Sequence, residues 1–253
     1  IDSIAKITKD LLYECYYTFY HPSNMLLFIV GPISPEEMME KIRENQKKKS
    51  FQEAPEIQRK FPEEPTSVYE TKSILKMNVQ MQKCMVGIKG DFIGQKGDEM
   101  LKTELSVQLL LDMLFSQSSE NYRSLYDEGI IDDTFSYDYT QEESFSFALI
   151  GGDTANADLL GERIKQILMK AAKGENLSEV SLERAKKRRI GNFLRALNSP
   201  EFIANQFTRY AFNGMDLFKV VPMLENIAFT DIKEIAKAMF KEDRITQSIV
   251  VPK

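Results

Sequence analysis

Apolar side chains near the start of the chain recur at helical spacing and then give way to an uninterrupted apolar run. The helical positions are Leu11, Leu12, Cys15, Tyr16 and Phe19. Thr8 is a suitable N-cap, and His21-Pro22 ends the helix because proline disfavours helical geometry in the residue before it. The run from Met25 to Val30 has the length of a strand buried on both faces. The pattern therefore predicts a helix, a turn and a buried strand.

The same order of patterns returns near the end of the chain. From Thr230 a helical pattern leads into a second apolar run, and proline closes both runs, at Pro32 and Pro252. The spacing between helix and strand is nearly equal in the two places, and such self-similarity is typical of repeated structural units. We therefore interpret residues 1–46 as the C-terminal remnant of a first domain whose earlier part is not in this sequence.

A polar segment separates this remnant from the rest. Ser34 and Pro35 begin a helix that we expect to reach about Gln46. Residues 47–66 have no clear period and contain prolines at positions 55, 62 and 65, which is typical of a linker between domains. Residues 67–253 then form a second domain.

The second domain mixes helical and alternating patterns in unequal runs. Strands are predicted at 68–76, 77–89, 134–139 and 144–150 and at the C-terminus, and helices at 99–115, 118–128, 157–173, 181–197, 200–212, 218–221 and from residue 230. Gly129 and Gly174 are suited to end two of these helices. The order indicates an α+β fold, with one antiparallel-rich sheet and helices packed on one of its faces.

Composition limits the classes of function. The chain has 253 residues, of which 43% are hydrophobic and 28% charged, with a net charge of −5 that argues against general nucleic-acid binding. It contains no apolar stretch long enough to span a bilayer. Cys15 and Cys84 lie within apolar patterns, so we expect buried, reduced thiols and a cytoplasmic location. Because Ile1 is not Met, we expect a processed or artificial start.

The sequence has one histidine, His21, and neither cysteine lies at metal-ligand spacing from it. A structural turn residue is the favoured interpretation. There is no G-x-S-x-G segment, so no nucleophile is indicated. Gly90, Gly94 and Gly97 lack the ending of a phosphate-binding loop and are interpreted as a plain loop. Gly151-Gly152-Asp153 is interpreted as the exit of a strand into a helix, with Asp153 or Thr154 near the cap.

Two charged segments have ordinary structural interpretations. A basic run on the helix at 181–197 comprises Arg184, Lys186, Lys187, Arg188 and Arg189. It is interpreted as a solvated helix face or a patch facing an acidic partner, since charge runs are usually solvated. The adjacent acids Asp132 and Asp133 are interpreted as turn residues rather than as an acid/base pair.

Several segments resemble one family. The stretch from Thr8 to Pro32, with Tyr20-His21-Pro22-Ser23-Asn24-Met25 before an apolar strand and Gly31, resembles the end of a domain in the pitrilysin/insulinase family of zinc peptidases, which includes the mitochondrial processing peptidases. Residues 114–130 are similar to the family's Ser-Arg-Leu-Phe-x-x-Leu-Arg-x-x-Gly-Leu segment. The resemblance extends over almost the whole chain and is greatest to bacterial members encoded as neighbouring paired genes. It implies a processing-peptidase-like domain preceded by the tail of a similar one.

The resemblance also implies which functional groups are missing. Family members hold zinc with a His-x-x-Glu-His helix and a later Glu, and this chain contains no such motif. An Arg and a Tyr that contact substrate in active members correspond here to Tyr126 and Asp132, so the pair is substituted. We therefore expect no catalytic and no metal-binding residue in this chain. Zinc is expected only in a full-length parent.

The expected function follows from this resemblance. The parent would be a zinc metalloendopeptidase that hydrolyses peptides, and this chain alone would be inactive, helping to form the substrate chamber and subunit contacts. The alternative is a non-catalytic scaffold or assembly subunit of the same family. Expected partners are a peptide substrate of the parent and a homologous subunit or a second copy, with no nucleic acid and no membrane. A third reading, an unrelated α+β binding protein, would require that the two ends of the chain share no structural likeness.

Overall fold

The computed structural model describes residues 2–53, 57–61 and 63–253. The chain divides into two compact units. Unit 1 takes in the described residues of Ile1–Pro62 together with Leu197–Thr208, and unit 2 comprises Glu63–Ala196 and Arg209–Lys253. The described residues of 49–66 form no helix or strand, and Pro55 and Pro62 lie outside the described residues, so the linker at 47–66 stays a prediction.

Unit 1 contains the two helices that its sequence predicts, α2 (Lys9–Phe19) and α3 (Pro35–Lys47). It also contains the short helix α1 (Asp2–Ala5), which was not predicted, and the 3₁₀ helix η1 (Pro22–Asn24), which forms the predicted turn. The side chain of Thr8 caps α2 by accepting a hydrogen bond from the Leu11 N–H at 3.2 Å, and Ser34 caps α3 through the Glu37 N–H at 3.3 Å. Each helix therefore begins at the residue whose hydroxyl the sequence offers as a cap.

The predicted strand at Met25–Val30 is wrong. The segment is not part of any sheet, and its apolar side chains are largely exposed. A strand requires a neighbour to pair its backbone N–H and C=O groups, and no described segment pairs with this one. The predicted burial of Cys15 is also wrong. No residue of α2 is buried, so the Cys15 thiol is exposed, while Cys84 is buried as expected.

Unit 2 is built on one five-stranded sheet with the order β1-β5-β2-β4-β3. The strands are β1 (Lys72–Met77), β2 (Gln82–Lys89), β3 (Ser136–Gln141), β4 (Ser146–Thr154) and β5 (Ile245–Pro252). The β1–β5 pair is parallel and the other three pairs are antiparallel. The C-terminal strand therefore lies inside the sheet, between the first two strands of the unit.

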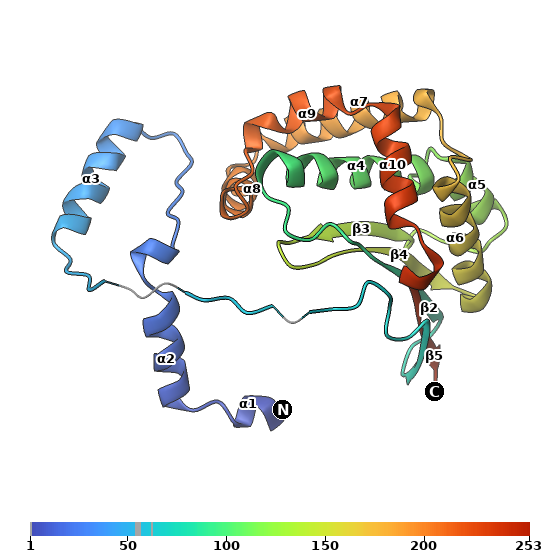
Figure 1. Cartoon of the computed structure of the whole chain (residues 1–253), viewed down its shortest axis with the longest axis horizontal. Helices are drawn as coiled ribbons and strands as arrows, with labels where there is room; N and C mark the ends of the chain where they lie inside the picture. Colours follow the sequence, from blue (N-terminus) through green and yellow to red (C-terminus); the bar gives the residue numbers. More distant parts are fainter. Residues whose placement is uncertain (1, 54–56, 62) are drawn as a thin grey trace. The chain divides into compact units, whose positions relative to one another are not determined.

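The helices of unit 2 lie on one face of this sheet (Figure 1). They are α4 (Gly97–Phe115), α5 (Glu120–Asp127), α6 (Ala157–Ala172), α7 (Glu179–Ala196), the 3₁₀ helix η2 (Leu217–Lys219), α9 (Val220–Asn226), α10 (Phe229–Met239) and the 3₁₀ helix η3 (Glu242–Arg244), while α8 (Pro200–Phe212) has residues in both units. α4 and α6 pack on the sheet, α10 packs on both, and α7 and α9 cover α4. The predicted α+β fold with helices on one face is confirmed.

The core lies between the sheet and these helices. In β2 the alternate residues Cys84, Val86 and Ile88 are almost fully buried and point toward the helices. α4 is the central helix, and fourteen of its residues are buried. A helix that is apolar on most of its circumference is expected in such a position, covered on several sides.

The two glycines of Gly151-Gly152 lie within β4, so the interpretation of this segment as a strand exit is wrong. A Cβ atom on Gly151 would collide with the Cys84 carbonyl oxygen of the neighbouring strand, which explains why glycine stands there. The strand continues to Thr154, and Asn156, not Asp153 or Thr154, caps α6 by accepting a hydrogen bond from the Leu159 N–H at 3.1 Å.

Candidate functional site

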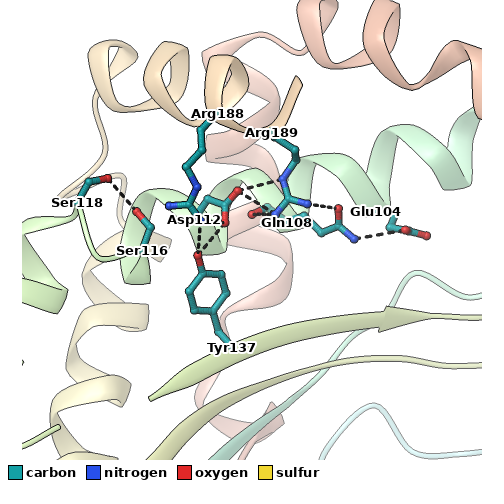
Figure 2. Close-up of polar contacts among 8 residues, drawn as sticks. All are labelled: Glu104, Gln108, Asp112, Ser116, Ser118, Tyr137, Arg188 and Arg189. Atoms are coloured by element: carbon teal, nitrogen blue, oxygen red, sulfur yellow. Dashed lines mark hydrogen bonds and ion pairs between the residues drawn. The ribbon is translucent and has the colours of Figure 1, made fainter. Parts of the chain in front are cut away.

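A row of polar side chains follows one face of the central helix α4 at four-residue spacing. Its members are Glu104, Gln108, Asp112 and Ser116 (Figure 2). The two carboxylates are among the most buried charged groups of the chain, with 3% and 5% of their side-chain areas exposed. A buried charge is costly unless it is paired and hydrogen-bonded, so the partners of these two groups decide what they can do.

Asp112 is held from two other elements of unit 2. Arg189 of α7 donates through Nε and Nη2 to Asp112 Oδ2 at 3.0 and 2.8 Å. Tyr137 of β3 donates its hydroxyl to Oδ1 at 2.7 Å, and the Arg188 guanidinium lies 3.6 Å from the same oxygen. Figure 2 shows the carboxylate enclosed by these three side chains. Both oxygens are therefore engaged by strong donors.

Glu104 has an equivalent arrangement eight residues earlier on the helix. Arg209, in the part of α8 that belongs to unit 2, donates to both carboxylate oxygens at 3.0 and 2.8 Å, a bidentate geometry. Gln108 connects the two pairs, since its amide nitrogen donates to Glu104 at 3.3 Å and its oxygen accepts from Arg189 at 2.7 Å. The result is one continuous chain of hydrogen bonds along α4.

The electrostatics of the cluster indicate a structural role. Burial, together with the nearby Asp112 charge, raises the pKa of Tyr137 to about 12, so the phenol stays neutral and donates its proton to the carboxylate. Each carboxylate faces a guanidinium that stays protonated. Neither oxygen pair is free to act as a general base or to bind a cation. The cluster instead fastens α4 to α7, α8 and β3.

The described residues do not supply a zinc site of the kind that the resemblance implies for a parent. Zinc sites require three or four His, Cys, Asp or Glu ligands close together, and the described part of the chain has no group of three or more such residues that could hold a metal ion. The ring of His21 lies in a turn, where Nδ1 accepts from the Ser23 N–H at 3.2 Å and Nε2 lies 2.9 Å from the Gln52 carbonyl oxygen. The carboxylates buried on α4 are neutralised by arginines. The donor set therefore does not fit a zinc ion.

The interpretation of the basic run on α7 as a solvated face is right for three members and wrong for two. Arg184, Lys187 and Arg188 are exposed, whereas Lys186 is buried and Arg189 is half-buried in the Asp112 cluster. Lys186 Nζ donates to the Glu225 carbonyl oxygen at 3.1 Å. The sequence did contain a signal that Lys186 and Arg189 face the protein interior. Positions 182, 186 and 189 share one helix face, and Leu182 is buried.

The two positions that match the family's substrate-contacting pair have ordinary surroundings. Tyr126 lies on α5 with its ring exposed and stacked on Tyr122, at a centroid distance of 6.0 Å. Asp132 holds a turn by accepting from the Thr134 N–H at 2.9 Å and from its hydroxyl. The hydroxyl bond and then the backbone bond lower the pKa of Asp132, so its charge serves the turn. The assignment of these positions to the family pair stays a prediction.

The face of the sheet opposite the helices is the other feature of interest. Its central row carries Ser73, Ser248, Met85, Gly151 and Ser136 across the five strands. A hollow of about 390 Å³ lies on this face, and its lining includes Lys83, Met85, Ser136, Ser248 and Val250. No described helix of unit 2 covers it. Small and polar residues on an uncovered face tolerate contact with water or with a bound polypeptide.

Together these features define an α+β domain that carries helices on one face of its sheet, an open second face and, among the described residues, no group of side chains that could hold a metal ion. The family model of the peptidase M16 inactive domain matches residues 6–189. The chain therefore belongs to the peptidase M16 family, as a part without the zinc motif, and its role is related to that of a peptidase.

Known proteins support this membership. The chain is 53% identical, over all 253 residues, to a Bacillus subtilis (strain 168) protein described as an uncharacterized zinc protease, YmfH. The crystal structure of an M16-like peptidase from Alicyclobacillus acidocaldarius is similar with 34% identity and a TM-score of 0.94 over the whole chain. The inactive domain from Pseudomonas fluorescens has the same fold, with 14% identity and a TM-score of 0.78 over the whole chain.

The chain spans about three fifths of the length of these relatives: 59% of the Bacillus protein, 60% of the Alicyclobacillus structure and 59% of the Pseudomonas structure. Among the described residues, no helix has the length and apolar character needed to cross a bilayer.

The carboxylate–arginine cluster escaped the sequence interpretation entirely. Arg189 lies 77 residues from Asp112 and Arg209 lies 105 residues from Glu104, and only the fold brings these partners together.

Proposed function

We propose that this chain is the non-catalytic part of a zinc-dependent peptidase that hydrolyses peptides, and that its open sheet face forms one wall of the substrate chamber. The observation that carries the proposal is that face: a sheet of five strands left uncovered by the helices of its own unit. The lining of its hollow includes Ser136, Gly152 and Ser248. These small residues accept an extended peptide without selecting strongly for its sequence.

The chemistry of hydrolysis would come from the rest of the parent. The Bacillus relative is described as a zinc protease, and zinc would there activate water for attack on a peptide bond. In this chain, all buried carboxylates of α4 are neutralised by arginine. We therefore expect the 253-residue chain alone to hydrolyse no peptide, with or without added zinc. A homologous partner subunit or a second copy would complete the assembly, and two free cysteines fit a cytoplasmic location.

The test is a pair of matched substitutions in the full-length parent, assayed with a fluorogenic peptide. Ser248 is exposed on the open face, so Ser248→Arg places a long cation in the hollow, and we expect KM to rise about tenfold. Ser118, exposed in the loop before α5, receives the same change as a control and should leave KM unchanged. Equal kinetics for the two variants would contradict a substrate-facing role, and zinc-dependent hydrolysis by the chain alone would contradict its inactivity.

The second candidate is a scaffold or assembly subunit that catalyses nothing. The observation in its favour is the large number of exposed apolar side chains in unit 1, which is expected of a surface that binds protein. Under this function the parent would form a stable complex yet show no peptide hydrolysis in the presence of zinc. Sedimentation of the parent and the same peptide assay together separate the two candidates.

A further inference from the structure

The strand β1 lies at an edge of the sheet, and its outer side is uncovered. β1 pairs on one side with β5, and no described segment pairs with its other side. Five of its six residues are exposed, and Ile74, Leu75 and Met77 are 50% to 56% exposed. An edge strand with large apolar side chains is a template for the addition of a further strand. No residue of β1 lines the hollow on which the proposed function rests.

The pairing with β5 determines which backbone groups of β1 point outward. Gln247 lies beside Lys72 in the register, and its N–H donates to the Thr71 carbonyl oxygen at 3.0 Å. The backbone groups of successive residues in a strand point to opposite edges, so the odd-numbered residues of β1 are the ones that bond to β5. The N–H and C=O groups of Lys72, Ile74 and Lys76 therefore point away from the sheet and can bind an added strand.

The two faces of β1 differ in character. Ile74 lies beside Ile249, which is buried under the helices, so Lys72, Ile74 and Lys76 share the helix side of the sheet. Leu75 lies on the open face. An added strand therefore meets two lysines on the helix side and apolar surface on the open face.

The charge on the helix side changes along β1. Lys76 is exposed at one end of the strand and forms no ion pair with any described residue. A hollow of about 440 Å³ lies at the other end, between β1, β5 and α6, and carries two lysines and three carboxylates. These charged residues are Lys72, Lys165, Asp158, Glu162 and Glu242.

One carboxylate of this hollow is left without a cation among the described residues. Lys72 pairs with Asp158 at 2.5 Å and Lys165 with Glu242 at 3.8 Å. Glu162 accepts a hydrogen bond from the neutral Gln166 amide at 3.0 Å. The outer edge of β1 is therefore positive at the Lys76 end and borders a net negative hollow at the Lys72 end.

We propose that the outer edge of β1 binds an extended segment of another protein, antiparallel to β1, with an acidic, three apolar and a basic residue in that order. Antiparallel pairing is the more stable kind, and directly opposite side chains share a face. The central apolar residue exchanges both backbone hydrogen bonds with Ile74. The acidic residue then lies opposite Lys76, and the basic residue lies opposite Lys72, beside Glu162. One of the other two apolar residues packs on Leu75.

A second copy of the chain does not fit this edge. Antiparallel pairing of two β1 strands about Ile74, which joins the largest number of outward backbone groups, places Lys72 of one copy opposite Lys76 of the other. Like charges directly opposite each other destabilise a strand pair, and lysines on edge strands oppose self-association. A partner with the complementary order of charges avoids this repulsion.

Binding of two fluorescein-labelled peptides to the 253-residue chain, measured by fluorescence anisotropy, tests the order of charges. The probe is Gly-Glu-Leu-Val-Leu-Lys-Gly, and the control, Gly-Lys-Leu-Val-Leu-Glu-Gly, has the same composition and net charge. We expect the Kd of the control to be about tenfold higher, because both of its charges face like charges in the proposed register. Equal affinities, or no binding of the probe, would overturn the proposal.

Methylation of single peptide nitrogens tests the backbone pairing. In the proposed register the valine N–H donates to the Ile74 carbonyl oxygen, whereas the N–H of the second leucine points away from β1. Methylation of the valine nitrogen should therefore raise the Kd of the probe about tenfold, and methylation of that leucine nitrogen should leave it nearly unchanged. Equal losses would show that the peptide does not bind as a strand in this register.

Variants of the chain locate the site. Lys76→Glu should weaken binding of the probe about tenfold and favour a peptide with lysine in place of the glutamate. Lys173→Glu, an exposed change at the far end of α6, is the control and should leave the Kd unchanged. Equal effects of the two variants would place the peptide elsewhere on the chain.

Ile74→Pro removes an outward N–H without removing a hydrogen bond to β5, and proline is tolerated at such edge positions. It should abolish binding of the probe and leave the urea midpoint of unit 2 unchanged; if the variant fails to fold, the Lys76→Glu comparison still decides. Sedimentation that showed the wild type, but not this variant, to dimerise would assign the edge to a second copy and overturn the proposal. None of these measurements involves peptide hydrolysis, so their outcome is independent of the proposed function.

Discussion

The segment α2–η1–Val30 of unit 1 and the segment α10–η3–β5 of unit 2 have one local structure and two different environments. Both form an eleven-residue helix and a 3₁₀ turn at equal spacing. Only the second continues as a strand, between β1 and β2. The comparison teaches that helix, cap and turn follow from local hydrogen bonds, whereas a strand exists only where neighbouring strands accept its backbone groups.

The largest expected effect comes from placing a charge at corresponding positions of the two helices. Ile232 is fully buried and Leu12 is 59% exposed. In the 253-residue chain, Ile232→Asp should lower the free energy of unfolding of unit 2 by more than about 4 kcal/mol, because a buried unpaired carboxylate is among the costliest substitutions. Leu12→Asp should change it by less than about 0.5 kcal/mol.

Alkylation of the Cys84 thiol measures the effect of these two substitutions on the stability of unit 2. This thiol is buried, and burial raises its pKa, although the hydrogen bond from Gln247 opposes the shift, so alkylation in urea reports the opening of unit 2. The exposed Cys15 is first replaced by serine to remove its background. If Leu12→Asp proved as costly as Ile232→Asp, α2 would already be packed in the chain alone, and the contrast between the two segments would disappear.

The next effect concerns the helix on which α10 rests. Asp112→Ala removes the acceptor of Arg189 and Tyr137, although the Arg189 side chain is 27% exposed and keeps its hydrogen bond to Gln108. Breaking a fully buried pair costs about 3–5 kcal/mol, and we expect a loss of about 3 kcal/mol, at the lower end of that range, for unit 2 in urea. Amide exchange should accelerate in α10 and stay unchanged in α2.

Arg184→Ala is the matched control for this cluster, since Arg184 lies on α7 but is exposed. Its effect should stay within about 0.5 kcal/mol. If Asp112→Ala were as mild as the control, the cluster would not be what holds α4 in place. If α2 responded together with α10, the two segments would not be independent in the isolated chain.

The elements and the family could be predicted from the sequence because their signals are local. Thr8 and Ser34 are caps within three residues of the amides that they bind, and Gly129 and Gly174 have the positive φ values suited to helix ends. Periodicity identified the helices from α4 to α10 and the strands of the sheet. The C-terminal apolar run is a strand as predicted, because unit 2 supplies both of its neighbours.

The failures concern interactions between distant parts of the chain. Met25–Val30 has the composition of a buried strand, yet composition carries no information on whether neighbouring strands are present. Gly151 was interpreted as part of a strand exit into a helix, because the close approach of Cys84 that places it inside β4 is a property of strand pairing. Arg189 was assigned to a solvated face since its partner Asp112 lies 77 residues away.

A smaller effect on stability is expected from removing the N-terminal caps of α2 and α10. α2 is capped by the Thr8 hydroxyl, whereas the N-cap residue of α10 is Ala228, whose N–H is bound instead by the Asp231 carboxylate at 2.8 Å. Asp231→Ala should lower the free energy of unfolding of unit 2 by about 1 kcal/mol, the usual cost of a lost cap. Thr8→Ala should reduce the helical signal of α2 in circular dichroism and leave the urea midpoint of unit 2 unchanged. A shift of that midpoint by Thr8→Ala would show that α2 stabilises unit 2.

The smallest effect is the pH dependence of that cap. Burial raises the pKa of Asp231, but the hydrogen bond from Ala228 and the ion pair with Lys102 outweigh burial, so its pKa is lowered overall. A carboxyl whose folded pKa is depressed contributes stability above its unfolded pKa, near 4, and loses it as the pH falls through the folded value. The difference in unfolding free energy between the wild type and Asp231→Ala should therefore be constant from about pH 7 to 5 and shrink below about pH 4. The exposed neighbour Glu234, changed to alanine, supplies the baseline, and a difference that persisted unchanged at pH 3 would mean that the cap does not depend on the Asp231 charge.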